Sequence, residues 1–223
     1  VSRAQADEFA LASQQKYAKA EADGFYKGEI HPIALPTKKK DAPPVVVEQD
    51  EHPRRDASME SLAKLKPLFE GGVVTAGNAS GVNDGAAALA IGNRQWGENN
   101  GKKPMVRILS GAAAAVEPRI MGVGPAFAIP LACERAGIKL SDLDIIEINE
   151  AFASQVLACL TLLKLDFKDA RVNPNGGAIA IGHPLGASGA RLALTVARQL
   201  ERMNGRYAAV SLCIGVGQGL AII

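Results

Sequence analysis

The sequence predicts an α/β protein in which helices cover the faces of a sheet. From residue 73 onward, short apolar runs alternate with helix-like segments of roughly 10–20 residues, a pattern typical of strands separated by helices. The chain has 223 residues, 48% hydrophobic and 4% aromatic, so it can bury a large core of aliphatic side chains. Its glycines cluster at 71–85, 122–124, 176–189 and 215–219, which indicates specific backbone sites rather than a flexible linker.

Residues 1–72 are expected to form a loop-rich excursion. Ser2 and the glutamine three residues later have the spacing of a capping box, which predicts a helix over roughly residues 3–22. Residues 30–57 combine several prolines with many charges, which predicts an irregular segment with two short strands. Ser58 then precedes a short amphipathic helix in MESLAKLKPLF, for which it is the expected N-cap.

Residues 73–223 are expected to form the α/β domain. Its strand-like segments are short and apolar, and several of its helix-like segments end at a glycine. We expect a strand or loop at 73–80, strands at 106–116, 144–149, 206–215 and 218–223, and helices at 83–93, 125–137, 150–163 and 185–205.

Charge and hydropathy argue against several classes of protein. The formal net charge is only +2, so we expect no nucleic-acid partner and no membrane-surface partner. No run of 18 apolar residues is present, which predicts no membrane span. Charged residues interrupt the first 20 positions, so these are not expected to act as a signal peptide.

Cysteine and histidine usage points to a reducing compartment and to no metal site. The three cysteines, Cys133, Cys159 and Cys213, form no CxxC pair, so we do not expect a disulfide framework. We therefore expect a cytoplasmic location. The three histidines are far apart in the sequence and near no cysteine cluster, so no metal ligands are predicted.

A few polar residues stand at predicted junctions of strands with helices or turns. Asn149 and Glu150 follow an apolar strand, where α/β proteins build ligand sites, although both could simply cap the next helix. His183 lies in a glycine-rich segment and could be an ordinary turn residue. Cys213 ends an apolar strand and could be an inert small hydrophobe, but the glycines after it expose backbone beside the sulfur. One Asn, one His and one Cys at one sheet edge could fix a water, activate a nucleophile and shuttle a proton.

Four segments together resemble the thiolase family, the acetyl-CoA acyltransferases. They are GNASGVNDGAAA (77–88), NEAFA (149–153), GGAIAIGHPLGASGAR (176–191) and CIGVGQG (213–219), and their order and spacing agree with the family along essentially the whole chain. Within the family, VEPRIMGVGP and CIGVGQG are most similar to the β-ketoadipyl-CoA (3-oxoadipyl-CoA) thiolases. The resemblance implies a thiolase-like layered fold, of which this chain is the second, C-terminal half with most of the loop domain.

The resemblance also implies an activity and residue roles. Thiolases cleave a 3-ketoacyl-CoA with free CoA to acetyl-CoA and a shortened acyl-CoA, or run the reverse Claisen condensation. Cys213 resembles the acid/base cysteine, which protonates the departing acetyl-CoA carbanion in cleavage. His183 resembles the residue that activates the nucleophile and donates to the thioester oxyanion, and Asn149 the residue that holds the water of that oxyanion hole. The backbone N–H of Gly215 is similar to a donor of the second hole, and we expect His183 and this turn to stabilise the Cys213 thiolate.

CoA and acyl-CoA are expected as substrates, without a permanently bound cofactor. Lys38, Lys39 and Lys40 could attract this polyanion or lie in a solvated loop. The residues similar to the family's CoA contacts are Arg54 at the phosphates, Ser61 and Leu65 near the adenine, Ala76 and Ser80 along the pantetheine arm, and Met121 and Phe152 at its reactive end.

No cysteine here has the Cys-(Ala/Ser)-Ser-Gly context of the family's nucleophile. Cys133 and Cys159 lie in apolar helical segments and are expected in the core. The resemblance therefore implies a partner that supplies the N-terminal half, and a homo-oligomer, either dimer or tetramer. One interpretation is the acid/base half of an acyltransferase, inactive alone. The others are a CoA-binding protein without turnover and a non-catalytic assembly fragment.

Overall fold

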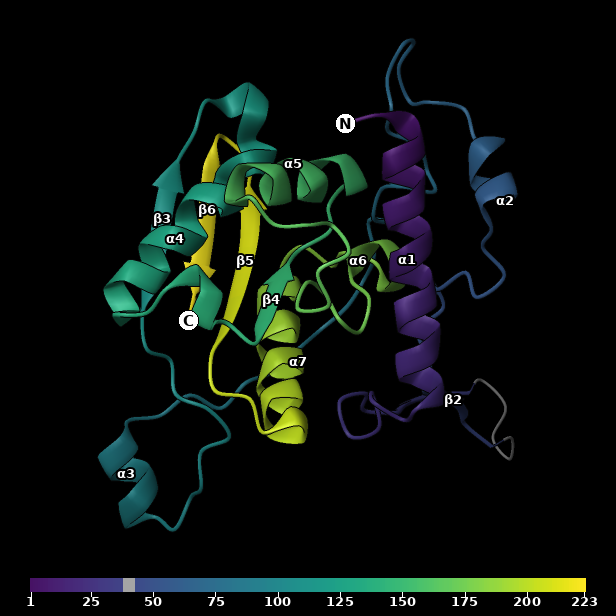
Figure 1. The fold of residues 1–223 in the computed structure, drawn as a ribbon. Helices are drawn as coiled ribbons and strands as arrows, with labels where there is room; N and C mark the ends of the chain where they lie inside the picture. Colours follow the sequence, from purple (N-terminus) through teal and green to yellow (C-terminus); the bar gives the residue numbers. More distant parts are fainter. Residues whose placement is uncertain (38–42) are drawn as a thin grey trace.

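The computed structural model describes residues 1–37 and 43–223 and has the predicted α/β architecture (Figure 1). Its larger sheet has four strands in the order β3-β6-β5-β4. β4 and β5 are parallel, β6 is antiparallel to β5, and β3 is antiparallel to β6. The strands are β3 (Gly111–Ala115), β4 (Ile145–Ile148), β5 (Ala208–Ile214) and β6 (Gln218–Ile222).

Helices cover both faces of this sheet. α4 (Gly124–Ala136) and α5 (Ala153–Leu163) lie on one face, and α7 (Ser188–Met203) lies on the other (Figure 1). Successive strand residues point to opposite faces. Accordingly, Ile146 and Ile148 of β4 belong to the core cluster with α4 and α5, whereas Ile145 packs with residues of α7. Both clusters consist mainly of Ala, Val, Ile and Leu, as the composition predicts.

The N-terminal helix α1 (Arg3–Ala22) confirms the prediction for residues 3–22. The Ser2 hydroxyl accepts a hydrogen bond from the backbone N–H of Gln5, and the Gln5 side chain accepts one from the backbone N–H of Ser2, so the capping box is present. α1 packs against α5 and against the short helix α6 (Ala178–Ile181), and it runs beside them in Figure 1. The helix is therefore fixed to the elements that precede the glycine-rich loop of His183.

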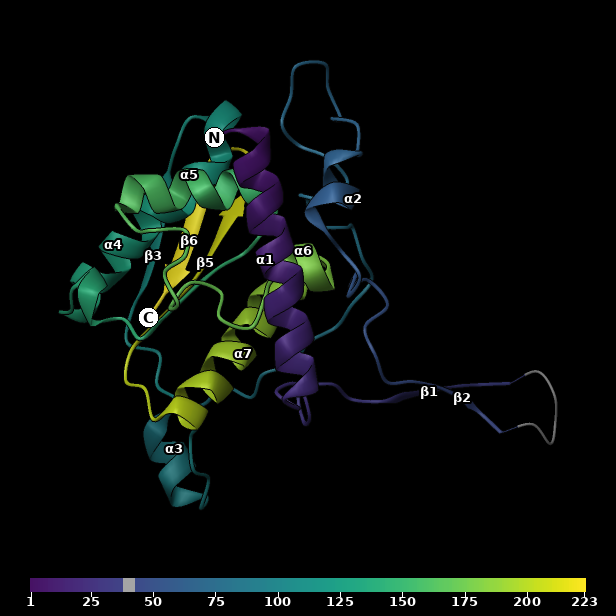
Figure 2. The same cartoon turned by 45° about the vertical axis from the view of Figure 1, so that its right-hand side comes forward.

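The excursion contains the two predicted short strands. β1 (Ile33–Leu35) and β2 (Val45–Val47) form an antiparallel hairpin with exposed residues, and Figure 2 shows it extending away from the rest of the chain. Lys38, Lys39 and Lys40 lie outside the described residues. α2 (Met59–Ala63) has Ser58 as its N-cap, as predicted, but it is shorter than the expected segment and ends at Ala63. Pro67 disfavours helix at the residue before it, so the helix does not continue through the rest of that segment. The boundary expected at residue 72 stays a prediction.

The expected helix over residues 83–93 is wrong. This segment has no regular secondary structure, and most of its residues are exposed. Its alanines and glycines would bury little apolar surface, and helices shorter than about 12 residues are marginal without tertiary packing. A helix begins only at α3 (Arg94–Asn99), which Asn93 caps. The strand expected over 106–116 is likewise limited to β3, where β6 supplies hydrogen-bond partners. The short helices α6, η1 (Pro118–Val123) and η2 (Leu140–Asp142) were not predicted.

A buried carboxylate, Glu150, joins segments that are far apart in the sequence. It accepts hydrogen bonds from Ser13 Oγ (2.6 Å), Asn173 Nδ2 (2.8 Å) and the backbone N–H of Ile179 (3.2 Å). Gly177 lies so close that an added Cβ would be 2.4 Å from the Glu150 carboxyl carbon. Glu150 therefore holds α1, the loop after β4 and α6 together at one point, through charge-assisted hydrogen bonds.

Glu147 is as deeply buried as Glu150, but its surroundings are different. Neither of its carboxylate oxygens has a hydrogen-bond partner among the residues that the structure describes. Burial raises the pKa of Glu147 to about 8, and the nearby charge of Arg191 opposes that rise only in part. In the folded chain Glu147 is therefore mainly protonated at pH 7.

We expect Glu150→Gln to lower the free energy of unfolding by about 1–3 kcal/mol. The new amide NH2 would face a donor at either oxygen position. Asn173 cannot turn to accept, because its Oδ1 already accepts from the backbone N–H of Ile148 and its Nδ2 donates to the Ile148 carbonyl oxygen. Urea unfolding at pH 7 measures the change. Unfolding curves that coincide with wild type would contradict this role of Glu150.

Glu147→Gln is the matched substitution, and we expect it to raise the free energy of unfolding rather than lower it. The pKa of Glu147 is raised from 4.5 to about 8, so unfolding releases a proton in this window. Wild-type stability therefore falls as pH rises from 4.5 to 8, by about 1.4 kcal/mol per pH unit for one such group. Gln cannot ionise, so its advantage over wild type should grow from pH 5 to pH 8. Parallel curves of stability against pH would show that Glu147 does not titrate in this way.

Candidate active site

The structure brings two of the predicted residues into direct contact at the ends of β4 and β5. Asn149 follows β4, and its Nδ2 lies 3.2 Å from His183 Nε2. The backbone N–H of Asn149 donates to the carbonyl oxygen of Ser211 in β5 (2.9 Å), two residues before Cys213. The parallel pairing of these strands thus places Asn149 and Cys213 at the same edge of the sheet.

His183 is held by its backbone as well as by its ring. Its N–H donates to the carbonyl oxygen of Gly81 (3.1 Å) and to Asn83 Oδ1 (3.2 Å). Gly182 has a φ of +93°, and an added Cβ would lie 2.2 Å from Asn83 Oδ1. Glycine is therefore required there both by conformation and by the close approach of Asn83.

The second ring nitrogen of His183 contacts the first residue of α7. Nδ1 lies 2.6 Å from Ser188 Oγ, and Ser188 Oγ donates to the carbonyl oxygen of Pro184 (3.0 Å). Ser188 is 1% exposed, so water does not compete for this hydroxyl. The imidazole is thus fixed from both sides, by Asn149 at Nε2 and by Ser188 at Nδ1.

Asn149 has an unused acceptor. Its side chain is buried, and its Oδ1 has no hydrogen-bond partner in the part of the chain that the structure describes. Neither Asn149 nor Glu150 caps the following helix, because Phe152 is the N-cap of α5 and makes no side-chain capping bond. A buried orphan acceptor beside an imidazole is suited to holding a polar ligand atom or a water.

Burial sets the protonation states of the two titratable groups. It lowers the pKa of His183 from its usual value, and the charge of Arg191 lowers it further. Burial also raises the pKa of the half-buried Cys213 thiol. The expected stabilisation of a Cys213 thiolate is therefore wrong for this structure, because the loss of solvation outweighs the backbone hydrogen bond that favours the thiolate. Both groups are neutral at pH 7.

The turn after Cys213 is tightly constrained at one glycine and open at another. Gly217 has a φ of +92°, and an added Cβ would lie 2.2 Å from the carbonyl oxygen of Val116. An added Cβ at Gly215 would meet no atom within 4 Å. This turn therefore leaves space next to the backbone of Gly215, and the role of its N–H as an oxyanion donor stays a prediction.

The residues expected to contact CoA fall into two groups. Ser80 and Phe152 lie beside the active-site loop: Ser80 donates to the carbonyl oxygen of Ala151 through its backbone N–H (3.0 Å) and its hydroxyl (3.2 Å), and Ala79 pairs with Phe152 in an isolated bridge. Met121 lies in η1, which packs on α5. Arg54, Ser61, Leu65 and Ala76 lie on the excursion and the loop after it, so a common CoA site for all seven stays a prediction.

Two residues of the site were missed from the sequence. Asn83 lies in the quoted GNASGVNDGAAA segment, and Ser188 stands five residues after His183 at the start of a helix. A polar residue inside a glycine-rich segment, and a serine buried in the first turn of a helix, were the available signals.

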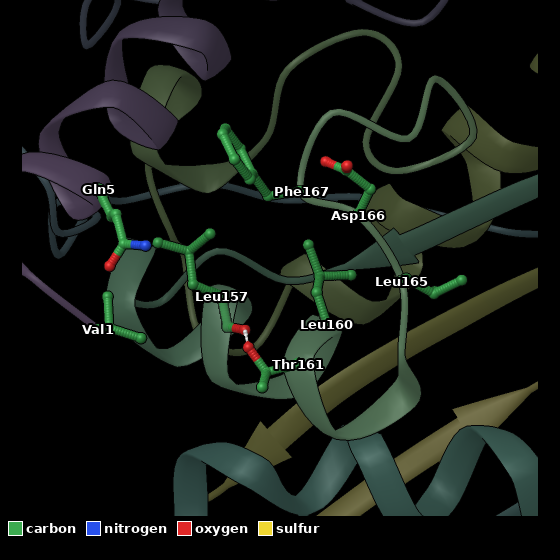
Figure 3. Close-up of a pocket in the computed structure, with 8 residues that line it drawn as sticks. All are labelled: Val1, Gln5, Leu157, Leu160, Thr161, Leu165, Asp166 and Phe167. Atoms are coloured by element: carbon green, nitrogen blue, oxygen red, sulfur yellow. Dashed lines mark hydrogen bonds between the residues drawn. The ribbon is translucent and has the colours of Figure 1, made fainter.

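A separate hollow of about 330 Å³ lies between the start of α1 and α5 (Figure 3). Leu157, Leu160, Leu165 and Phe167 give it an apolar wall, and Asp166 is its one titratable side chain. The side-chain hydroxyl of Thr161 in this wall donates a hydrogen bond to the carbonyl oxygen of Leu157, one turn earlier in α5. Its lining residues include no histidine and no cysteine, so the site at His183 remains the candidate.

Two classes of feature are absent from the described residues. Within residues 1–37 and 43–223, no group of three or more His, Cys, Asp or Glu side chains could hold a metal ion. In the same ranges, no helix is both long and apolar enough to span a membrane.

Comparisons with known proteins agree with the geometry. A model of the thiolase C-terminal domain matches residues 102–223, and a model of the thiolase N-terminal domain matches residues 1–95. A β-ketoadipyl-CoA thiolase of Acinetobacter baylyi is 51% identical over the whole chain, and a 3-oxoadipyl-CoA/3-oxo-5,6-dehydrosuberyl-CoA thiolase of Escherichia coli K12 is 52% identical. The chain spans 55% of the length of each of these relatives.

Solved structures give the same result. The structure of the Bacillus anthracis acetyl-CoA acetyltransferase matches this chain with a TM-score of 0.94 and 42% sequence identity. The structure of human mitochondrial 3-ketoacyl-CoA thiolase matches with a TM-score of 0.91 and 42% sequence identity. Each comparison covers 100% of this chain and 55% of the solved chain. A structure of the human enzyme in complex with CoA matches with a TM-score of 0.89.

The exposure of the thiols provides a test of the site. We expect iodoacetamide to modify one cysteine per native chain, because Cys133 and Cys159 are buried and Cys213 is half-buried. The raised pKa of Cys213 predicts that its labelling rate reaches half its maximum above pH 9.0. Mass spectrometry after timed labelling measures both, with Cys213→Ser as the unlabelled control. Rapid labelling near pH 7, or of several thiols, would be the contrary result.

Proposed function

The chain belongs to the thiolase family, and from this membership and the site geometry we propose that it carries the acid/base half of a thiolase. The proposed reaction is the cleavage of a 3-ketoacyl-CoA by CoA, or the reverse Claisen condensation. The observation that carries the proposal is the contact of His183 with Asn149 at the sheet edge that also holds Cys213. A binding protein would need no thiol there.

The protonation states fit the cleavage direction. A thiolate on the acyl-carrying cysteine attacks the C3 carbonyl, and the C2–C3 bond breaks to release the acetyl-CoA carbanion. The resting Cys213 thiol donates its proton to that carbanion and afterwards recovers one from the incoming CoA thiol. Neutral His183 accepts the proton of the acyl-carrying cysteine, while Asn149 Oδ1 holds a water that donates to the thioester oxygen.

The acyl carrier has to come from outside these residues. Burial raises the pKa of Cys133 and raises that of Cys159 to about 12, and both lie in core helices. We propose that a polypeptide matching the rest of the relatives' length supplies it. Val82, Leu185 and Val216 support this partner: they lie in the three segments around the site and are 92%, 72% and 82% exposed. Apolar side chains so placed indicate a surface that another chain covers.

The names of the relatives support a substrate. Several are β-ketoadipyl-CoA thiolases, so we propose 3-oxoadipyl-CoA as the 3-ketoacyl-CoA substrate. CoA and acyl-CoA would act as substrates rather than as a bound cofactor. We further propose a cytoplasmic location, since the three cysteines are free thiols. A homo-oligomer is proposed only from the resemblance to the family.

A reconstitution experiment tests the proposal. We expect the purified chain to cleave neither acetoacetyl-CoA nor 3-oxoadipyl-CoA with CoA, and to do so when mixed with the unmatched part of the Acinetobacter baylyi relative. In that mixture, Cys213→Ser should lower the exchange of acetyl-CoA α-protons with deuterium by at least about 10²-fold.

Cys133→Ser is the control, because Cys133 lies in the core of α4 and should leave the exchange unchanged. Turnover by the chain alone would contradict the external acyl carrier. CoA binding by the mixture without any turnover would support the CoA-binding interpretation instead.

A further inference from the structure

We infer that Ser188 is a positioning residue that fixes His183 as the tautomer protonated at Nδ1. The inference rests on the proposed function, in which Nε2 of His183 accepts a proton and therefore must carry no hydrogen in the resting chain. It is carried by the contacts on the two sides of the ring, which agree with each other.

The first contact concerns the Ser188 hydroxyl. It has one proton, and Ser188 Oγ lies 3.0 Å from the Pro184 carbonyl oxygen, which can only accept. With its proton directed to Pro184, Ser188 Oγ can only accept at its other contact, which is His183 Nδ1 at 2.6 Å. His183 Nδ1 therefore carries the hydrogen.

The second contact is at the opposite ring nitrogen. Asn149 Nδ2 is a donor and lies 3.2 Å from His183 Nε2, so Nε2 accepts. A neutral imidazole has one donor and one acceptor nitrogen, and this arrangement again assigns the hydrogen to Nδ1.

The support of this serine is rigid and dry. Ser188 begins α7 and is 1% exposed, while Leu192 and Val196 of the same helix are buried against the sheet. The His183 backbone is held independently by Gly81 and Asn83. Because the helix and the loop are both anchored, the Ser188 hydroxyl and His183 Nδ1 are held within hydrogen-bond distance of each other.

The tautomer determines what His183 can do. With the hydrogen on Nδ1, Nε2 keeps a lone pair, which accepts from Asn149 Nδ2 in the resting chain and in the proposed reaction would take the proton of the acyl-carrying thiol once that thiol replaces the amide as its partner. The opposite tautomer presents an N–H there and cannot act as the base. A group that only orients the histidine thus controls the step without contacting substrate.

Nitrogen-15 NMR of histidine-labelled chain at pH 8 tests the assignment, because His183 is neutral there. His52 is an internal standard: its Nδ1 lies 2.9 Å from the Ala180 carbonyl oxygen, which can only accept, so His52 is protonated at Nδ1. We expect the ring nitrogens of His183 to show the same pattern. A pattern with the hydrogen on Nε2 would overturn the inference.

Substitution then tests the part played by Ser188. In Ser188→Ala we expect the ratio of the Nδ1–H to the Nε2–H form of His183 to fall at least about fivefold, whereas Ser188→Thr keeps a hydroxyl and should retain the wild-type pattern. Ser110→Ala is the matched control, since it removes another serine bond to a backbone carbonyl (2.7 Å to Ala132) outside the site.

An unchanged tautomer ratio in Ser188→Ala would overturn the role of Ser188. If Ser188→Thr fails to fold, the comparison of Ser188→Ala with Ser110→Ala still shows whether Ser188 sets the tautomer of His183. The spectra do not depend on turnover, so failure of the acyl-transfer proposal in the reconstitution assay would be recognised separately.

Discussion

The buried carboxylate of Glu150 is the interaction on which the arrangement of the site depends. Three donors converge on it, from α1, from the loop at Asn173 and from the start of α6. Asn149 is its neighbour in sequence, and α6 leads directly into the loop of His183. The hydrogen bonds that hold Glu150 therefore also determine where two functional side chains meet. A buried carboxyl group is tolerated inside the fold when donors satisfy its oxygens, as these three do here.

Glu147 shows what burial does without such partners. It lies in β4, whereas Glu150 lies in the loop that follows β4, and the two have the same low exposure. No described residue donates to Glu147, so burial shifts it towards the protonated form. Two glutamates three residues apart thus differ in their hydrogen-bond partners: three donors meet Glu150, and none among the described residues meets Glu147. The same desolvation acts on His183 and Cys213, where it favours the neutral imidazole and the neutral thiol.

Local patterns predicted those parts of the structure that local interactions determine. The capping box at Ser2, the N-cap at Ser58 and the two short strands follow from nearby residues, and the structure confirms them. The small-residue segment 83–93 was misassigned because its conformation depends on packing that its own sequence does not encode. Neither the orphan state of Glu147 nor the contact of Ser188 with His183 follows from spacing. The first depends on what packs around β4, and the second on how the loop of His183 turns back onto the start of α7. The motifs identified His183, Asn149 and Cys213, but not the residues that hold them.

In the proposed reaction, a neutral imidazole and a neutral thiol at one sheet edge would act as base and acid. Neither His183 nor Cys213 carries a charge that could stabilise the other. In the proposed reaction, a proton would therefore move only when the acyl-carrying thiol or the substrate carbanion arrives as its donor or acceptor. Val82, Leu185 and Val216 are exposed apolar residues around these groups. In the proposed function, a covering surface there would exclude water and bring in the acyl-carrying thiol. The ring of His183 is held at both nitrogens and its backbone is held as well, so in the proposed reaction it would need no reorientation to accept a proton.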